Sequence, residues 1–297
     1  MTRYAVRHET TYRYRRPVDR GLHVLRVTPL NFGGQRSLRQ TLTIEPEPTR
    51  IDMFVDHFGN VVHHVAVEKQ HERLSATLNA VVEVARPAIA DDGPAWETIR
   101  AAMQDDGFPM PPRVAEFATG SPLAPFEDSA TLYAAESFAA DRPIVAALRD
   151  IAGRIYRDFR YTPHSTTIAT KVAEVIAMRR GVCQDFAHLM IDGLRGLGVP
   201  ARYVSGYLYT HATPDAAGHL GADASHAWVS VWCGERLGWI EVDPTNDLVV
   251  ENEHVVVAYG RDFSDATPLH GVILGGGSHT LSVAVGVTSL DGDNEKA

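Results

Sequence analysis

Apolar and polar positions alternate along most of the first third of the chain. The alternation is clearest in YAVRHETTYRY, LRQTLTIEPEP, VVHHVAVEKQ and LNAVVEVARP, which are rich in Val, Thr and Tyr. A period of two places successive side chains on opposite faces of a strand, and β-branched and aromatic residues favour strands. DHFGN, at residues 56–60, is typical of a turn between two such strands. Residues 1–88 are therefore predicted to form an N-terminal β-domain, either an antiparallel β-sandwich or a twisted sheet.

The pattern changes after residue 88. Residues 89–130 are rich in Pro, Gly and acidic residues and read as a connector that includes one short helical piece, AWETIRAAMQ. Beyond it, DRPIVAALRDIAGRIYRDF carries a helical stripe of apolar positions, and TKVAEVIAMRR predicts a second helix. A third helix is predicted over residues 183–197, with Gly198 and Pro200 as its stop signals. The stripe of the first helix consists of Ile144, Ala147, Leu148, Ile151 and Ile155.

Strand patterns return after the third helix. ARYVSGYLY, SHAWVSVW and GWIEVDP read as strands, the last two joined by a hairpin at CGERL, and HTLSVAVGVTSL predicts a final strand. The fold class is therefore predicted as α+β. Residues 131–297 are expected to form the second domain, a helix packed on an antiparallel sheet, with the C-terminal strands included.

Composition narrows the classes of function. The 297 residues carry a formal net charge of −9, which argues against nucleic acid as the main partner because phosphate binding needs a basic face. The first residues contain no apolar stretch typical of a signal peptide, and no run of about 18 apolar residues predicts a membrane span. Only two cysteines occur, so a cytoplasmic location with free thiols is expected.

One of these cysteines, Cys183, stands at the start of the third predicted helix, in RRGVCQDFAHLM. The unpaired N–H groups and the dipole of a helix N-terminus lower the pKa of a thiol there and favour the nucleophilic thiolate. The alternative is a buried structural cysteine, since free cysteine is among the most buried residue types. A nucleophile also needs a base, and the base needs a group that orients it.

His226 and Asp243 lie at matching ends of the predicted hairpin and fit these two roles. If Gly234 and Glu235 form the loop, paired residue numbers sum to 469 and residue 226 stands opposite 243. A loop two residues longer gives 471 and makes the two diagonal neighbours. Both sums are odd, so both registers place the imidazole and the carboxylate on one face. Taken singly, each residue has a structural reading, as a core histidine and as a turn residue before Pro244.

The order Cys, His, Asp in GVCQDFAHLM, ASHAWVSVW and GWIEVDPTND resembles the transglutaminase-like core of the papain-like cysteine enzymes. More narrowly, YAVRHETTYRYRRPV, LHVLRVTPL and DHFGNVVHHVAV resemble the N-terminal β-domain of bacterial transglutaminase-like proteins. The resemblance covers nearly the whole chain. It implies Cys183 as nucleophile, His226 as base and then acid, and Asp243 as the orienting group.

The resemblance also implies the reaction, which is acyl transfer or hydrolysis at an amide through a thioester, without a cofactor. Hydrolysis is favoured over transfer to an amine, because relatives of this bacterial group are mostly described as cysteine proteases. A peptide or protein is the expected substrate, and the family's association with amide-ligating ATP-grasp proteins adds such a protein as a partner. A different class of function is a non-catalytic peptide-binding module on the same fold.

The sequence leaves open the roles of the residues that surround these three. Asp185 reads either as a substrate-orienting group or as an ordinary first-turn acid, and Trp228 either walls the acyl site or fills the core. Animal transglutaminases form part of their oxyanion hole with an upstream Trp side chain that has no counterpart here, which leaves Gln184 or Tyr161 as second donor beside the Cys183 backbone N–H. No metal is predicted, because the histidines show no zinc spacing. His188 is read as structural, Tyr207 and Asn246 are weaker site candidates, and residues 260–262 are expected to line the cleft by resemblance only. The histidines considered as metal ligands are His63, His64, His211 and His219.

Overall fold

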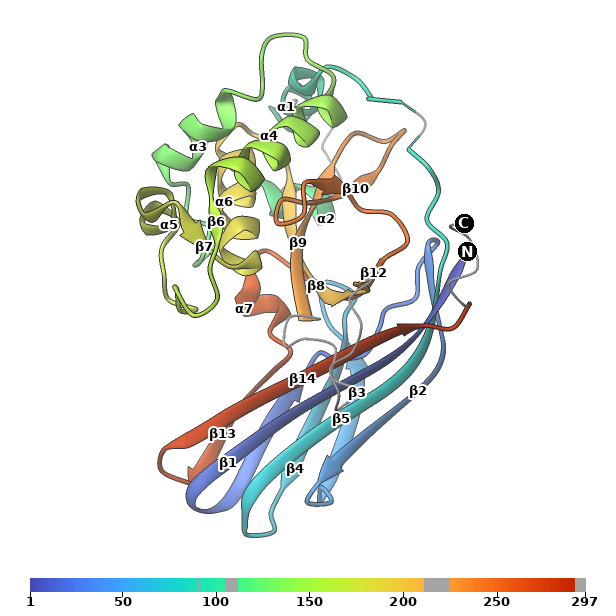
Figure 1. The fold of residues 1–297 in the computed structure, drawn as a ribbon, viewed down its shortest axis with the longest axis vertical. Coiled ribbons are helices and arrows are strands. Elements are labelled where there is room, and N and C mark those ends of the chain that lie inside the picture. The colour runs from blue at the N-terminus through green and yellow to red at the C-terminus, as the bar shows by residue number, and fades with distance from the viewer. Residues whose placement is uncertain (90, 105–111, 211–224, 292–297) are drawn as a thin grey trace.

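The computed structural model describes residues 1–89, 91–104, 112–210 and 225–291. A long, curved antiparallel sheet forms one end of the molecule, and a smaller sheet covered by helices forms the other (Figure 1). The predicted α+β class is confirmed. None of the helices in the described part of the chain combines the length and the apolar character that a membrane span requires.

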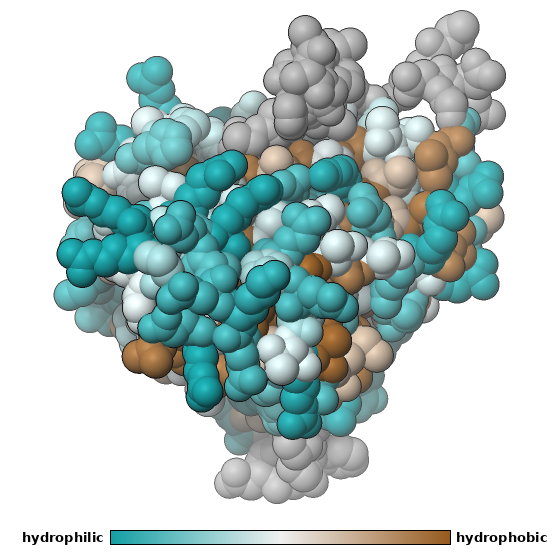
Figure 2. Space-filling view, turned by 90° about the horizontal axis from the view of Figure 1, so that it is seen from below, coloured by the Kyte–Doolittle hydropathy of each residue, from teal (hydrophilic) through white to brown (hydrophobic). Residues whose placement is uncertain are grey.

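Seven strands make up the larger sheet. Tyr4, Val6 and His8 are buried while Arg3 and Arg7 are exposed, which is the alternation that the sequence predicts. The sequence left open whether these strands form a sandwich or a twisted sheet. The structure shows a single curved sheet. The face in Figure 2, which views the molecule from this end, is mainly hydrophilic with separate apolar patches. The strands are β1 (Thr2–Leu25), β2 (Gln35–Glu45), β3 (Arg50–Val55), β4 (Val61–Val67), β5 (His71–Val84), β13 (Leu269–Gly275) and β14 (His279–Ser289).

The last two strands of the chain belong to this sheet. β14 pairs with the first half of β1 and β13 with its second half, while β5 and β4 occupy the opposite edge of β1. Strands that the sequence analysis grouped with residues 131–297 therefore hydrogen-bond to the start of the chain. The end of β14 accordingly lies beside the start of β1 (Figure 1).

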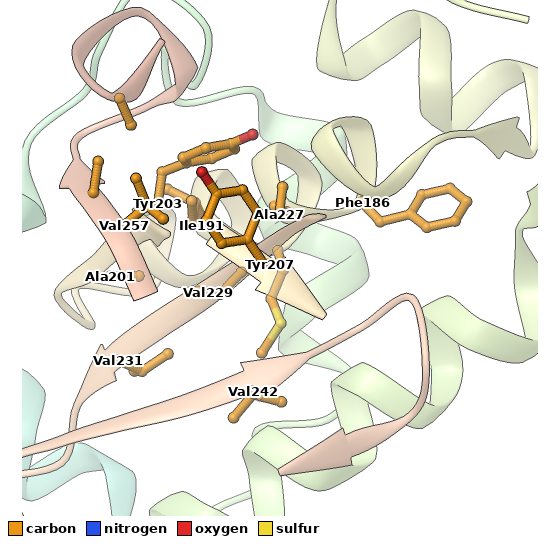
Figure 3. Packing of buried hydrophobic residues seen from close by; sticks show 14 of the residues in the cluster. Phe186, Ile191, Ala201, Tyr203, Tyr207, Ala227, Val229, Val231, Val242 and Val257 are labelled. Carbon is orange, nitrogen blue, oxygen red and sulfur yellow. The ribbon is translucent and has the colours of Figure 1, made fainter. Parts of the chain in front are cut away.

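The smaller sheet has the strand order β11-β10-β9-β8-β12. One of its faces packs on helix α6, with Val229, Val231 and Val242 in the same buried cluster as Phe186 and Ile191 (Figure 3). The opposite face packs Trp228, Val204 and Val256 around Leu30 from the N-terminal region. The strands are β8 (Ala201–Leu208), β9 (Ser225–Trp232), β10 (Trp239–Asp243), β11 (Leu248–Val249) and β12 (His254–Gly260), and a separate parallel pair is formed by β6 (Arg160–Tyr161) and β7 (Arg180–Gly181).

The predicted helices are confirmed. All five residues of the predicted apolar stripe on α4 are at most 1% exposed. Helix α6 begins at Cys183, as predicted, and Gly198 follows its end with a positive φ of 81°, which an L side chain rarely adopts. The helices are α1 (Trp96–Gln104), α2 (Pro112–Ala115), the 3₁₀ turn η1 (Glu116–Ala118), α3 (Asp128–Ala135), α4 (Ile144–Asp158), α5 (Val172–Met178), α6 (Cys183–Gly196) and α7 (Phe263–Ala266).

Side-chain hydrogen bonds join the two parts of the molecule. The Gln35 side chain donates to the Val256 carbonyl and accepts from its N–H, at 2.8 and 2.7 Å. The Asn60 side chain binds the backbone of Tyr259 in the same way, with both bonds at 2.7 Å. The larger sheet therefore holds β12, the edge strand of the smaller sheet, in a fixed position.

Candidate active site

Cys183 is the first residue of α6 and is partly exposed. Its helix start is fixed by Asp185, whose carboxylate accepts the Val182 N–H at 2.8 Å and the Thr166 hydroxyl at 2.6 Å. Asp185 is 3% exposed, and a Cβ at Gly181 would lie 2.8 Å from its Oδ2, so glycine is needed at that position. The Asp185 carboxylate thus works as a helix cap, the second of the two roles that the sequence left open.

The two candidates for the second oxyanion donor lie beside the cysteine. Gln184 follows it in the first turn of α6 and is half-buried. Tyr161 pairs with Gly181 in the short parallel ladder of β6 and β7, which brings this tyrosine next to the segment that leads into Cys183. The first N–H groups of α6, on Cys183 and Gln184, have no intrahelical acceptor by the geometry of any helix start.

The hairpin register is the diagonal one. Trp239 pairs with Trp232 and Val242 with Val229, so paired numbers sum to 471. His226 and Asp243 consequently share a face, and His226 Nε2 lies 2.7 Å from Asp243 Oδ2. The sequence prediction that one face carries both side chains is confirmed.

Asp243 is fully buried and accepts several hydrogen bonds. Its Oδ2 binds His226 Nε2 at 2.7 Å, His254 Nε2 at 3.0 Å and the Asn246 amide at 2.7 Å. Its Oδ1 accepts the Thr245 N–H at 2.9 Å. Burial alone would raise the pKa of Asp243, but the charge and hydrogen bonds of His226, followed by those of His254, hold it well below its usual range. The carboxylate therefore stays ionised at neutral pH.

His226 is the basic partner in this arrangement. Burial alone would lower the pKa of His226, but the Asp243 carboxylate and then a side-chain hydrogen bond with Cys183 raise it to about 10. Since Nε2 is bound to Asp243, the other ring nitrogen, Nδ1, is left for the thiol. The three side chains predicted from the sequence therefore lie together, in the order thiol, imidazole, carboxylate.

A second buried carboxylate, Glu241, lies beside the site on the same strand as Asp243. It accepts Trp228 Nε1 at 2.8 Å, Arg86 Nη1 at 2.9 Å and the Tyr259 hydroxyl at 2.9 Å. The Trp228 indole is 0% exposed and stacks on His226, with ring centroids 6.0 Å apart. A Cβ at position 206 would lie 2.5 Å from the Trp228 ring, so only glycine fits there. Trp228 therefore supports the imidazole from the interior of the protein.

His188 has a structural position, as the sequence analysis expected. It is 4% exposed, its Nε2 accepts the Phe263 N–H at 3.2 Å, and its ring packs on Tyr203 at 5.2 Å. Burial lowers the pKa of His188 to about 4, so the ring is neutral. In the segment of residues 260–262, Asp262 caps α7 by accepting the Ser264 N–H at 2.8 Å.

His226, Asp243 and His254 are the one group in the described ranges whose ligand atoms lie close enough together for a metal, within 4.8 Å of one another. The separations of 2.7 and 3.0 Å from both imidazoles to Asp243 Oδ2 are those of hydrogen bonds. A metal would have to replace the protons that make these bonds. His63 instead bonds the Thr28 hydroxyl at 2.9 Å, and His211 and His219 lie outside the described residues.

His254 is the residue of the site that the sequence analysis missed. It begins β12, and its position opposite Leu208 on β8 places it near His226, the second residue of β9, which stands opposite Gly206. A signal was present, because ENEHVVVAYG and ASHAWVSVW each place a histidine directly before an apolar strand. Only the strand order, with β9 and β12 on the two sides of β8, brings both histidines to one carboxylate.

We expect His254→Leu to lower the reactivity of Cys183 about tenfold or more, since a hydrogen bond to a charged group contributes roughly 1.5–3 kcal/mol. The substitution removes one of the donors that lower the pKa of Asp243, so the pKa of this carboxyl should rise. A group with a lowered pKa loses its effect as pH falls, and the acid limb of a pH–rate profile should therefore move to higher pH. His254→Gln keeps a donor and should restore most of the rate. An acid limb that stays in place in the leucine variant would remove His254 from the site.

Comparison with known proteins agrees with this geometry. Residues 4–83 match the bacterial transglutaminase-like N-terminal region, and residues 133–244 match the transglutaminase-like superfamily. An uncharacterized protein of Mycobacterium tuberculosis is 40% identical over 98% of this chain and 94% of its own length. The chain belongs to the transglutaminase-like superfamily.

This chain is also similar to two proteins whose names describe an activity. A stretch of 75 residues, 25% of this chain, is 40% identical to a protein-glutamine gamma-glutamyltransferase of Pseudomonas aeruginosa and covers 11% of that enzyme. The solved structure of a candidate cysteine protease from Cytophaga hutchinsonii matches 98% of this chain and 92% of its own, with a TM-score of 0.76 at 23% identity. That match shows a shared fold, in agreement with the papain-like core predicted from the sequence.

Proposed function

We propose that this protein is a cysteine hydrolase that cleaves an amide through a thioester on Cys183. The observation that carries the proposal is the cysteine at the start of α6 beside His226, whose Nε2 lies 2.7 Å from Asp243 and whose pKa Cys183 helps to raise. An imidazole with a raised pKa holds its proton at neutral pH and pairs with a thiolate. The positive end of the helix dipole stabilises the same negative charge.

In the proposed reaction the Cys183 sulfur attacks the amide carbonyl carbon, and the carbonyl oxygen takes up the negative charge. When the tetrahedral intermediate collapses, the C–N bond breaks and His226 gives its proton to the departing amine or ammonia. Water then attacks the thioester while His226 takes a proton from it, and the acid leaves as the thiol is regenerated. Asp243 keeps the imidazole in one orientation throughout.

Backbone N–H groups are the oxyanion donors in this proposal. The N–H groups of Cys183 and Gln184 open α6 and have no intrahelical partner, so they are available to an oxygen bound beside the sulfur. This backbone pair makes the upstream tryptophan side chain of animal transglutaminases unnecessary. Gln184 follows Cys183 in α6 and Tyr161 pairs with Gly181 two residues before it, so both belong to the proposed substrate-binding surface.

Hydrolysis is the outcome that we favour, because Cys183 is partly exposed and water has access to a thioester formed there. The second candidate is transfer to an amine. It is supported by the local similarity to the gamma-glutamyltransferase, and it would use the same three residues. A peptide, an isopeptide or a glutamine side chain is the proposed substrate class, and a protein that ligates such amides is the proposed partner.

Dimethylcasein and a mixed peptide library, each with and without dansylcadaverine, test the proposal. A hydrolase should release new amino groups or ammonia and leave the dansyl amine unincorporated, and Cys183→Ala should remove the signal. Covalent incorporation of the amine at a rate that matches ammonia release would establish the transferase instead. Absence of both products, together with a Cys183 as slow toward iodoacetamide as a free thiol, would overturn both candidates.

A further inference from the structure

A cleft of about 560 Å³ lies between the larger sheet and α7, outside the site described above. Its size is within the range of small-ligand pockets in proteins. None of its lining residues is acidic, and none is a lysine or an arginine. Among its lining residues are Tyr12, Tyr14, His23, Ile168, Phe263 and His279.

The rings of Tyr12, Tyr14 and His279 form one wall of the cleft. Tyr12 and Tyr14 stack with ring centroids 6.2 Å apart, and His279 meets Tyr12 edge-on at 5.3 Å. Burial raises the pKa of Tyr14 to about 12, so its hydroxyl stays protonated at neutral pH. The wall is therefore aromatic.

A buried histidine, His23, also lines the cleft. His23 is 5% exposed, and its Nε2 has no hydrogen-bond partner among the residues that the structure describes. Burial, followed by the nearby His71, lowers the pKa of His23 to about 4, so the ring is neutral. Glycines make room for it, because a Cβ at Gly21 would collide with Nε2 and one at Gly271 would lie 2.6 Å from Nδ1. The two glycines therefore let the ring pack closely against the sheet.

The opposite wall is attached to the start of α6. Phe263 donates its backbone N–H to His188 of α6, and its ring meets Tyr203 edge-on at 6.2 Å. Ile168 lies two residues after Thr166, whose hydroxyl bonds Asp185 in the first turn of the same helix. The cleft therefore adjoins the helix end that carries the proposed nucleophile.

We propose that the cleft is a subsite that binds an uncharged aromatic side chain, tyrosine or tryptophan, of the substrate polypeptide near the amide that Cys183 attacks. The proposal rests on the function proposed above. Aromatic walls favour stacked or edge-on contact with another ring, and tyrosine and tryptophan also carry a polar tip that can pair with polar lining residues such as Ser264 and Thr267. A charged side chain would enter a cleft whose lining offers no opposite charge.

Affinity alkylation tests the subsite in the full chain, with Cys233 changed to serine. The probes are iodoacetyl groups joined through none to three glycines to tyramine, or to cadaverine as the cationic counterpart. Each rate is divided by the iodoacetamide rate of the same variant. At one spacer length the tyramine probe should gain at least tenfold over the cadaverine probe, and Ile168→Asp should remove the gain. Leu132→Asp, on the exposed face of α3, is the matched control and should keep it.

The outcomes separate the subsite from the chemistry. Fast, His226-dependent alkylation by iodoacetamide, with no gain for tyramine at any spacer length, would overturn the subsite and leave the proposed function standing. An equal gain for the cadaverine probe, or a gain that survives Ile168→Asp, would also overturn it. Slow iodoacetamide alkylation would count against the proposed function itself.

Discussion

Replacing Cys183 by alanine should abolish amide turnover, with a loss of at least about 10⁴-fold, because no other group in the site can form the acyl intermediate. The fold should remain intact, since alanine is accommodated at a helix start without a steric clash. Turnover of any amide that the wild-type protein cleaves, together with the thermal midpoint of unfolding, provides the measurement.

The matched control is the other cysteine, Cys233. It is 1% exposed, and burial raises the pKa of its thiol to about 12, so it should be inert. Cys233→Ala should therefore keep full turnover and lose only the stability that its packing contributes. The assignment also predicts non-additivity, because residues that act as a unit lose their effect together. If Cys183→Ala and His226→Ala combine as the product of the single losses, the two residues do not act as one unit.

The second large effect concerns the pH dependence of alkylation at Cys183. His226 has its pKa raised from 6.5 to about 10, so it keeps its positive charge throughout the neutral range and loses it only as pH rises through about 10. The rate of reaction with iodoacetamide should therefore be nearly constant between about pH 6 and 9. In His226→Ala the plateau should disappear, and the rate at pH 6 should fall roughly a hundredfold, since a thiol with a pKa of about 8.5 is less than about 1% ionised there.

Mass spectrometry of the modified protein follows this reaction in a Cys233→Ser background. His226→Ala is compared with His188→Gln, because His188 is buried on the same helix as the thiol but bonds the Phe263 N–H. Only the His226 change should alter the pH profile. A single titration near pH 8.5 in the wild-type protein, indifferent to His226, would mean that Cys183 is an ordinary thiol. The chain would then be a binding module on an enzyme's fold.

Several elements follow from the sequence alone because their signals are local. The stripe on α4 and the start of α6 at Cys183 depend on helical periodicity and on a nearby glycine stop. The shared face of His226 and Asp243 depends only on the odd sum of paired residue numbers, which holds for both loop lengths considered. The site could therefore be proposed without knowledge of the rest of the fold.

The remaining features were decided by tertiary structure. Asp185 gained its second hydrogen bond because the chain brings Thr166 beside it, and His254 joined Asp243 because β12 lies on the other side of β8. The C-terminal strands pair with β1, although the alternation of their residues does not indicate which strand they pair with. Strand periodicity specifies which side chains share a face, but the choice of neighbouring strand depends on the packing of the whole chain. For that reason the sequence by itself determined which three side chains form the proposed site, and only the tertiary structure decided what surrounds them.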